Sequence, residues 1–179
     1  MENTFTTGSQ AIYGLHGRCQ ILGIEEKLIG NETIAFYKVE LAKPPIGKSK
    51  KSEAAIWIPV KNANQVGLRS ASNSEQAAAA LKILSSREYY LNINESMKNI
   101  TRQIEDLVRN EGVIGLAKAY SYLFVRKSRE AICPTDLTRM IENTQRILFR
   151  ELAEALNQPQ KDLEAQIAKS IRVKLQPDN

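Results

Sequence analysis

The chain has 179 residues, of which 42% are hydrophobic and 25% charged, as is typical of a folded protein with one domain or two small ones. No apolar run approaches the roughly 18 residues that a membrane span needs, and residues 1–10 do not resemble a secretory signal. Two cysteines and one histidine are too few for a usual four-ligand zinc site. We therefore expect a cytoplasmic protein with no membrane association, no metal and no cofactor.

The net charge is +5, and nine of the eleven arginines fall after residue 72. Arginine is suited to bidentate contact with phosphate or carboxylate groups. A solvated helical surface explains the same composition, and a strong nucleic-acid binder is usually more basic. The charge therefore permits nucleic-acid binding without requiring it.

The first part of the chain alternates short runs of β-forming residues with turn residues. These runs predict strands over residues 10–15, 19–26, 33–41 and 54–60. Pro59 indicates that its strand is an edge strand or ends there. A connection over residues 43–52 holds four lysines and two prolines, which fits a solvated loop or a site of nonspecific phosphate attraction.

After residue 72 the hydrophobic period becomes helical. Asn73 and Gln76 fit a capping box at the start of a first helix. Two further helices are predicted over about 97–111 and 113–129. A long helix should begin at Pro134, with Cys133 as its cap. A final helix should begin at Pro159 and bury Leu163, Ile167, Ile171 and Leu175. The expected fold class is α+β, with a small Tudor/SH3-like antiparallel β-barrel over residues 1–72 and about five helices over residues 73–179.

The sequence holds no residue pattern that favours an enzyme. His16 is the only histidine and lies in a predicted turn, where a structural hydrogen bond is a simpler role than catalysis. Neither a glycine-rich phosphate loop nor a metal-ligand cluster is present. We therefore expect no catalytic residues and no enzymatic activity.

A binding module fits the sequence better. Because side chains alternate along a strand, Trp57 should point away from Ile56 and Ile58. Trp57 would then be either an exposed binding hot spot or a plug between the two domains. In the helical part, basic residues recur at spacings that place them on shared faces: Arg139, Arg146 and Arg150, then Lys98 and Arg102, then Arg126, Lys127 and Arg129. Such clusters could contact a DNA backbone without reading bases, and each alone could be a solvated face.

Three motifs carry a resemblance to a known family. They are Ile12-Tyr13-Gly14-Leu15-His16-Gly17, then Ile56-Trp57-Ile58-Pro59 with Val66-Gly67-Leu68-Arg69, and the helix that opens with Cys133-Pro134-Thr135-Asp136. Together they resemble the CarD/CdnL transcription regulators of bacteria, and the first part is also similar to the polymerase-interacting module of the transcription-repair coupling factor. The resemblance implies a Tudor-like module that docks on the RNA polymerase β subunit. It also implies a helical domain that lies on promoter DNA nonspecifically and tunes the open complex.

The resemblance assigns roles to individual residues. Lys27, Ile29 and Trp57 would face the polymerase, although the family often has Arg or Met where Trp57 stands. The DNA contacts would come from Lys98, Arg102, Arg126, Lys127, Arg139, Arg146 and Arg150. The family's usual groove-wedging tryptophan falls at about Ser96. The protein would associate with the nucleoid through RNA polymerase and would be a monomer outside the polymerase complex. The alternative is a protein–protein adaptor that uses the β-module to recruit a partner and has no DNA role.

Overall fold

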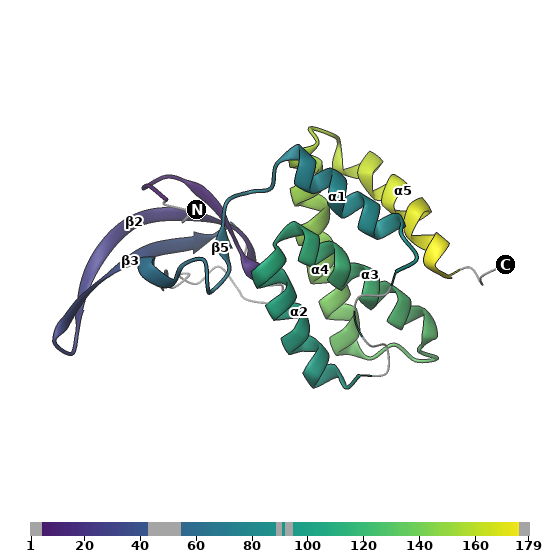
Figure 1. Ribbon diagram of the computed structural model, residues 1–179, viewed down its shortest axis with the longest axis horizontal. Coiled ribbons are helices and arrows are strands. Elements are labelled where there is room, and N and C mark those ends of the chain that lie inside the picture. The colour runs from purple at the N-terminus through teal and green to yellow at the C-terminus, as the bar shows by residue number, and fades with distance from the viewer. Residues whose placement is uncertain (1–4, 43–54, 89–90, 92–94, 176–179) are drawn as a thin grey trace. The chain divides into compact units, whose positions relative to one another are not determined.

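The computed structural model describes residues 5–42, 55–88, 91 and 95–175 (Figure 1). The chain divides into two compact units, Met1–Ala71 and Ser72–Asn179, a division one residue from the expected boundary. Among the described residues, the first unit contains the strands and the second contains five α-helices, so the α+β prediction is confirmed. No helix in the described part of the chain is long and apolar enough to cross a membrane. The lysine-containing loop over residues 43–52 lies outside the described residues.

The first unit is an antiparallel sheet with the strand order β4-β3-β2-β1-β5. Its strands are β1 (Gln10–Tyr13), β2 (Gly17–Ile29), β3 (Glu32–Leu41), β4 (Ile56–Pro59) and β5 (Leu68–Arg69). As Pro59 predicts, β4 is an edge strand that ends at this residue. Because β4 and β5 are the two edges, the sheet is open, an arrangement compatible with a Tudor-like fold.

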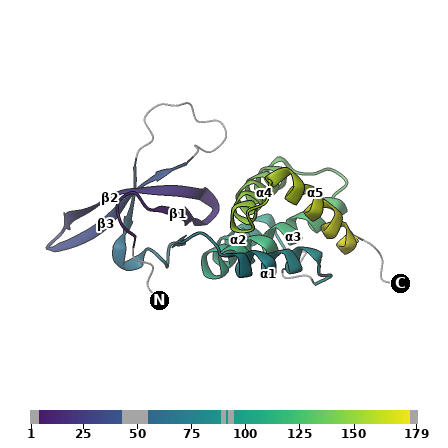
Figure 2. The same ribbon diagram turned by 90° about the horizontal axis from the view of Figure 1, so that it is seen from above.

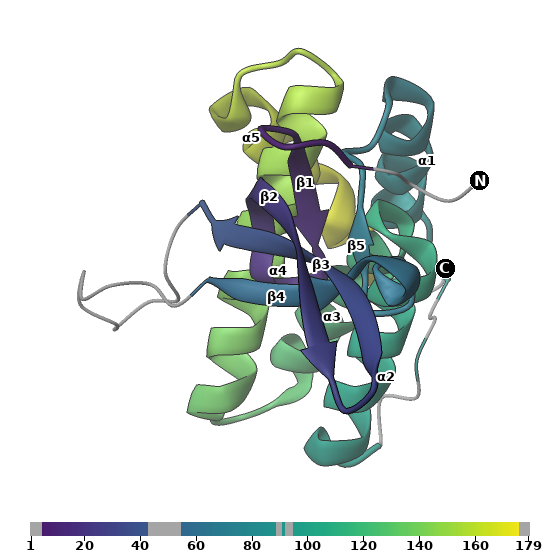
Figure 3. The same ribbon diagram turned by 90° about the vertical axis from the view of Figure 1, so that its left-hand side faces the viewer.

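Strands β2 and β3 form a long hairpin that extends past the neighbouring strands (Figures 2 and 3). Within β2, residues 17–20 are the ones that pair with β1, and within β3, residues 36–39 are the ones that pair with β4. A register shift between Ile21 and Gly23 adds one residue to β2 and bends the hairpin. The turn opens with Gly30 at a φ of 63°, a backbone conformation that favours glycine. The distal part of the hairpin is therefore an arm with two solvent-facing sides.

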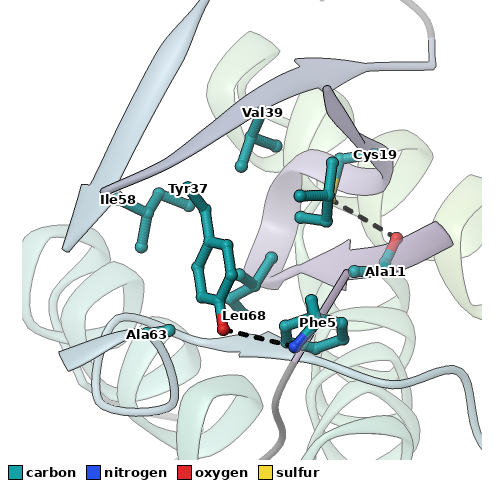
Figure 4. Close-up of a cluster of buried hydrophobic side chains, with 9 residues drawn as sticks. Phe5, Ala11, Cys19, Tyr37, Val39, Ile58, Ala63 and Leu68 are labelled. Atoms are coloured by element: carbon teal, nitrogen blue, oxygen red, sulfur yellow. Dashed lines mark hydrogen bonds between the residues drawn. The ribbon is translucent and has the colours of Figure 1, made fainter. Parts of the chain in front are cut away.

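The core of this unit lies on one face of the sheet (Figure 4). The Tyr37 hydroxyl accepts a hydrogen bond from the Phe5 amide at 3.2 Å, and the two rings meet edge to face with centroids 5.7 Å apart. The other buried members of the cluster are Ala11, Cys19, Ile21, Val39, Ile58, Ala63 and Leu68. The tyrosine hydroxyl thus satisfies a buried backbone donor from the residue that covers it.

The second unit is built around its third helix. The helices are α1 (Ser74–Ser85), α2 (Met97–Glu111), α3 (Val113–Arg129), α4 (Thr135–Ala155) and α5 (Gln160–Ile171). α3 packs against α1, α2 and α4 and is buried nearly all round, as expected for a central helix (Figure 1). Close packing of α2 on α3 requires Gly115, because a Cβ atom there would overlap the backbone of Leu107.

The structure confirms one predicted helix start and corrects another. The Gln76 amide donates to Asn73 Oδ1 at 2.8 Å and the Asn73 amide donates to Gln76 Oε1 at 3.1 Å, which completes the capping box before α1. Cys133 is not the cap of α4, because Pro134 occupies that position and the thiol instead lies 3.3 Å from Thr138 Oγ1.

The final helix also differs from its prediction. α5 ends at Ile171, and a short 3-10 helix over Arg172–Leu175 follows it. The change of period leaves Leu175 43% exposed, so its predicted burial is wrong, whereas Leu163, Ile167 and Ile171 are buried as expected.

Candidate docking and nucleic-acid surfaces

One side of the β2–β3 hairpin gathers the residues predicted to meet a protein partner. Lys27 pairs with Ile34 across the hairpin, and Lys38 pairs with Trp57 on β4. Paired residues in an antiparallel sheet share a side, and successive residues alternate between sides. Tyr37 and Ile58, which are paired with each other, are buried in the core, so Lys38 and Trp57 lie on the opposite side of the sheet. We call it the docking face and define it as Glu25, Lys27, Ile29, Ile34, Phe36, Lys38 and Trp57.

Two lysines lie over the indole ring of Trp57, which is on the edge strand of the docking face. Lys27 Nζ lies 3.1 Å from the centroid of the Trp57 ring and 5.9 Å from that of Phe36. Lys38 Nζ lies 5.3 Å from the Trp57 centroid and also forms an ion pair with Glu25 Oε1 at 3.3 Å. The contacts of Lys27 and Lys38 with the Trp57 ring are cation–π interactions, which are strongest over tryptophan. As predicted, Trp57 points away from Ile58, which is 2% exposed in the core.

Ile29 lies on the docking face two residues beyond Lys27, close to the hairpin turn, and is 53% exposed. It extends the face toward the tip of the arm. The opposite side of the arm holds Ile24 and Leu28, which are 49% and 73% exposed and which sequence reasoning did not single out. The sequence does carry a signal for exposed apolar residues on the arm, namely the pair Leu28-Ile29 directly before the Gly30-Asn31 turn. Apolar residues at the tip of a hairpin lie beyond the neighbouring strands and the core that those strands cover.

His16 has a local structural role. It ends the 3-10 helix Gly14–His16, and its ring stacks on that of Tyr13 with centroids 4.8 Å apart. Among the described residues, no three His, Cys, Asp or Glu side chains are grouped as metal ligands.

The three arginines predicted to form a stripe all lie on α4, at positions that bring them to one side of the helix. Arg139 is exposed. Arg146 Nη2 donates to Asn143 Oδ1 at 2.6 Å, and Arg150 Nε donates to Glu154 Oε1 at 3.2 Å. The stripe therefore includes one solvated guanidinium group and two that already contact neighbouring side chains.

Arg126, which is predicted as a phosphate contact, makes structural contacts within the helical unit. Its Nη1 donates to the Glu95 carbonyl oxygen at 2.7 Å and to the Tyr122 hydroxyl at 2.7 Å. Its Nε lies 3.6 Å from Glu130 Oε1, and only 13% of the side chain is exposed. The guanidinium group thus ties the end of α3 to the residues before α2, instead of facing solvent.

The Arg126–Glu95 contact brings two predicted basic clusters to one end of the helical unit. Lys98 and Arg102 are exposed in the first turns of α2, and Lys127 is exposed in the last turn of α3. Ser96, at the position of the expected wedge tryptophan, caps α2 instead, since its Oγ accepts from the Asn99 amide at 3.4 Å.

Comparison with models of known protein families finds no match for the chain, and comparison with curated proteins finds none either.

Proposed function

We propose that the protein is a non-catalytic, CarD-like transcription regulator of the bacterial cytoplasm that docks on the RNA polymerase β subunit through the docking face. The observation that carries this proposal is the contact of Lys27 with Trp57 on the solvent-facing side of the sheet. Tryptophan is enriched in binding hot spots, and a cation over its ring adds charge to an apolar contact surface. Ile29 continues the same face toward the arm tip.

In this proposal the helical unit contacts the promoter DNA backbone without reading bases and so tunes the lifetime of the open complex. Exposed cations support it: Lys98, Arg102, Lys127 and Arg139 are not ion-paired with any other described residue. Contacts to phosphate fix the position of a protein on duplex DNA but are insensitive to sequence.

A pull-down of the RNA polymerase β subunit by the full-length chain tests the docking. We expect Lys27→Glu to weaken the interaction by about tenfold or more, because charge reversal at an interface opposes a complementary partner. Lys61→Glu is the matched control, since Lys61 is an exposed lysine of the same unit outside the docking face. The docking proposal fails if the wild-type chain does not retain the β subunit.

The second candidate is a protein–protein adaptor with no DNA role. The pairing of Arg146 with Asn143 and of Arg150 with Glu154 favours it, because these guanidinium groups are already engaged. Open-complex half-life separates the two candidates. If charge reversal at Arg139, Arg146 and Arg150 together with Lys98 and Arg102 leaves the half-life unchanged while polymerase binding persists, the adaptor is correct.

A further inference from the structure

The β2–β3 hairpin carries most of the exposed large hydrophobic side chains that the structure describes. Four of these seven residues lie on it, namely Leu22, Ile24, Leu28 and Ile29. Ile29 belongs to the docking face, whereas Ile24 and Leu28 lie on the other side of the arm and are 49% and 73% exposed. Apolar residues scattered singly are common on protein surfaces, but two on one side of a protruding arm form a surface that the fold leaves uncovered.

The register of the hairpin places Ile24, Glu26 and Leu28 in one row, because residues two positions apart along a strand share a side. Ile24 pairs with Tyr37, which is buried in the core of the β unit. The row therefore continues the core side of the sheet outward, past the neighbouring strands (Figures 2 and 3). We call this surface the second face and define it as Ile24, Glu26, Leu28, Thr33 and Ala35.

The second face carries a single charge, which is negative. Glu26 is exposed and forms no ion pair with any other described residue. The adjacent Glu25 lies on the docking face, where it pairs with Lys38 at 3.3 Å. An acid between two apolar side chains complements an apolar surface with a cation at its centre. It opposes a second copy of this chain, because a two-fold axis through the face would bring two Glu26 carboxylates together.

The spacing of the row matches one face of an α-helix. Ile24, Glu26 and Leu28 follow one another at intervals of about 6.6 Å, since a strand rises about 3.3 Å per residue. Positions i, i+4 and i+8 of an α-helix share one face and follow one another at intervals of about 6 Å. A helix with apolar, basic and apolar side chains at these positions can therefore contact all three residues of the row at once.

We propose that the second face binds an amphipathic α-helix of another protein, with apolar side chains packed on Ile24 and Leu28 and a lysine or arginine opposite Glu26. The docking face occupies the other side of the same two strands, so the two surfaces do not compete for space. Binding of this helix goes beyond the proposed polymerase docking and does not require it. Where both occur, the arm links the polymerase to a second protein.

Photo-crosslinking of the full-length chain in the cells that produce it tests the inference. A benzophenone amino acid in place of Thr33, which pairs with Leu28 on the second face, should form an adduct with the second protein. Mapping should place the adduct in a helix with a lysine or arginine about one turn away. Glu26→Lys should lower the adduct yield about tenfold, and charge reversal of the mapped basic residue should restore it. Leu28→Ser should lower the yield as well.

Glu40→Lys is the matched control for Glu26→Lys. Glu40 is an exposed glutamate that pairs with Gln20 outside the arm, so the same charge change there should leave the adduct yield unchanged. A benzophenone in place of Ile29 reports on the docking face, where it should capture the polymerase β subunit.

The other outcomes overturn the inference and stay distinguishable from a failure of docking. An adduct of position 33 with the polymerase β subunit would show that the polymerase covers both sides of the arm. An adduct with a second copy of the chain would make the second face a dimer contact. If position 33 forms no adduct, or one that depends on neither Glu26 nor Leu28, while position 29 captures the β subunit, the second protein is ruled out and docking stands.

Discussion

Lys27 and Trp57 contact each other across an intervening strand: Lys27 is on β2, Trp57 is on β4, and β3 pairs with both. The ammonium nitrogen lies 3.1 Å from the ring centroid. The lysine side chain therefore spans the width of β3 and passes over Phe36, whose centroid is 5.9 Å from the same nitrogen. The contact orders a long side chain that would otherwise be free in solution, so its charge is presented at a defined place on the docking face.

A double-mutant cycle should measure this contact. We expect Lys27→Met and Trp57→Leu to couple by about 0.5–1 kcal/mol in the free energy of unfolding, as cation–π pairs at partly exposed sites do. Trp57 is the only tryptophan of the chain, so its emission reports directly on loss of the ammonium in Lys27→Met. Lys61→Met is the control and should leave the emission unchanged. Additive single-variant effects would show that the two side chains do not interact in solution.

The sequence could predict which way Trp57 points but not what covers it. The two-residue period of a strand is local and places Trp57 opposite Ile58. The contact with Lys27 depends on the register of three strands, which no local pattern encodes. Likewise, helical spacing is local and is enough to place Arg139, Arg146 and Arg150 on one stripe of a helix. Spacing could not predict the partner of Arg126, because that partner is the carbonyl oxygen of Glu95, 31 positions earlier.

The two cysteines should react with thiol reagents at very different rates. Cys19 is 2% exposed, and burial raises its pKa to about 11, so almost no thiolate exists at pH 8. Cys133 lies half-buried in the α3–α4 connection. Labelling of the native chain with a disulfide reagent should modify one thiol quickly, and the second only as the β unit opens. In Cys133→Ser the fast phase should vanish; a fast phase that survives would mean that Cys19 is accessible.

The same shift predicts a pH dependence of stability. The folded chain holds the Cys19 proton up to about pH 11, whereas the unfolded chain releases it near the ordinary pKa of 9.0. Between these values the native state binds more protons, so the free energy of unfolding should fall as pH rises. Denaturant titrations of the wild type and Cys19→Ala from pH 8 to 10.5 measure this, and the fall attributable to Cys19 is their difference. If the free energy of unfolding depends on pH in the same way in the wild type and in Cys19→Ala, the Cys19 thiol does not contribute the predicted fall.

The buried carboxylate of Glu151 should stabilise the start of the helical unit. Its Oε1 accepts from the Ser72 hydroxyl at 2.6 Å and from the Ser72 amide at 3.2 Å, just before α1 begins, and the residue is 3% exposed. Hydrogen bonds to a charged acceptor contribute more than neutral ones, so Glu151→Gln should lower the free energy of unfolding by about 1.5–3 kcal/mol. Glu154→Gln is the control and should cost at most about 1 kcal/mol, because its pair with Arg150 is partly exposed. Equal losses in the free energy of unfolding in Glu151→Gln and Glu154→Gln would show that the buried hydrogen bonds of Glu151 contribute no more than the partly exposed pair of Glu154.

Thr144 should be a site where a substitution stabilises the protein. The residue is 1% exposed on α4, and its hydroxyl oxygen has no hydrogen-bond partner among the described residues. Valine has nearly the same shape without the unsatisfied polar group, whose burial costs about 1–3 kcal/mol. Thr144→Val should therefore raise the free energy of unfolding by about 1 kcal/mol in denaturant titrations.

Thr138→Val, on the same helix, is the matched control for Thr144→Val. Thr138 Oγ1 donates to the Pro134 carbonyl oxygen and contacts Cys133 Sγ, so the same chemical change removes contacts that exist. Replacement of a bonded hydroxyl by a methyl group should therefore lower stability by about 0.5–1.5 kcal/mol. The hydroxyl of Thr138 has a partner and that of the more deeply buried Thr144 has none, so opposite signs are the diagnostic result. Destabilisation by Thr144→Val would mean that its hydroxyl has a partner in solution.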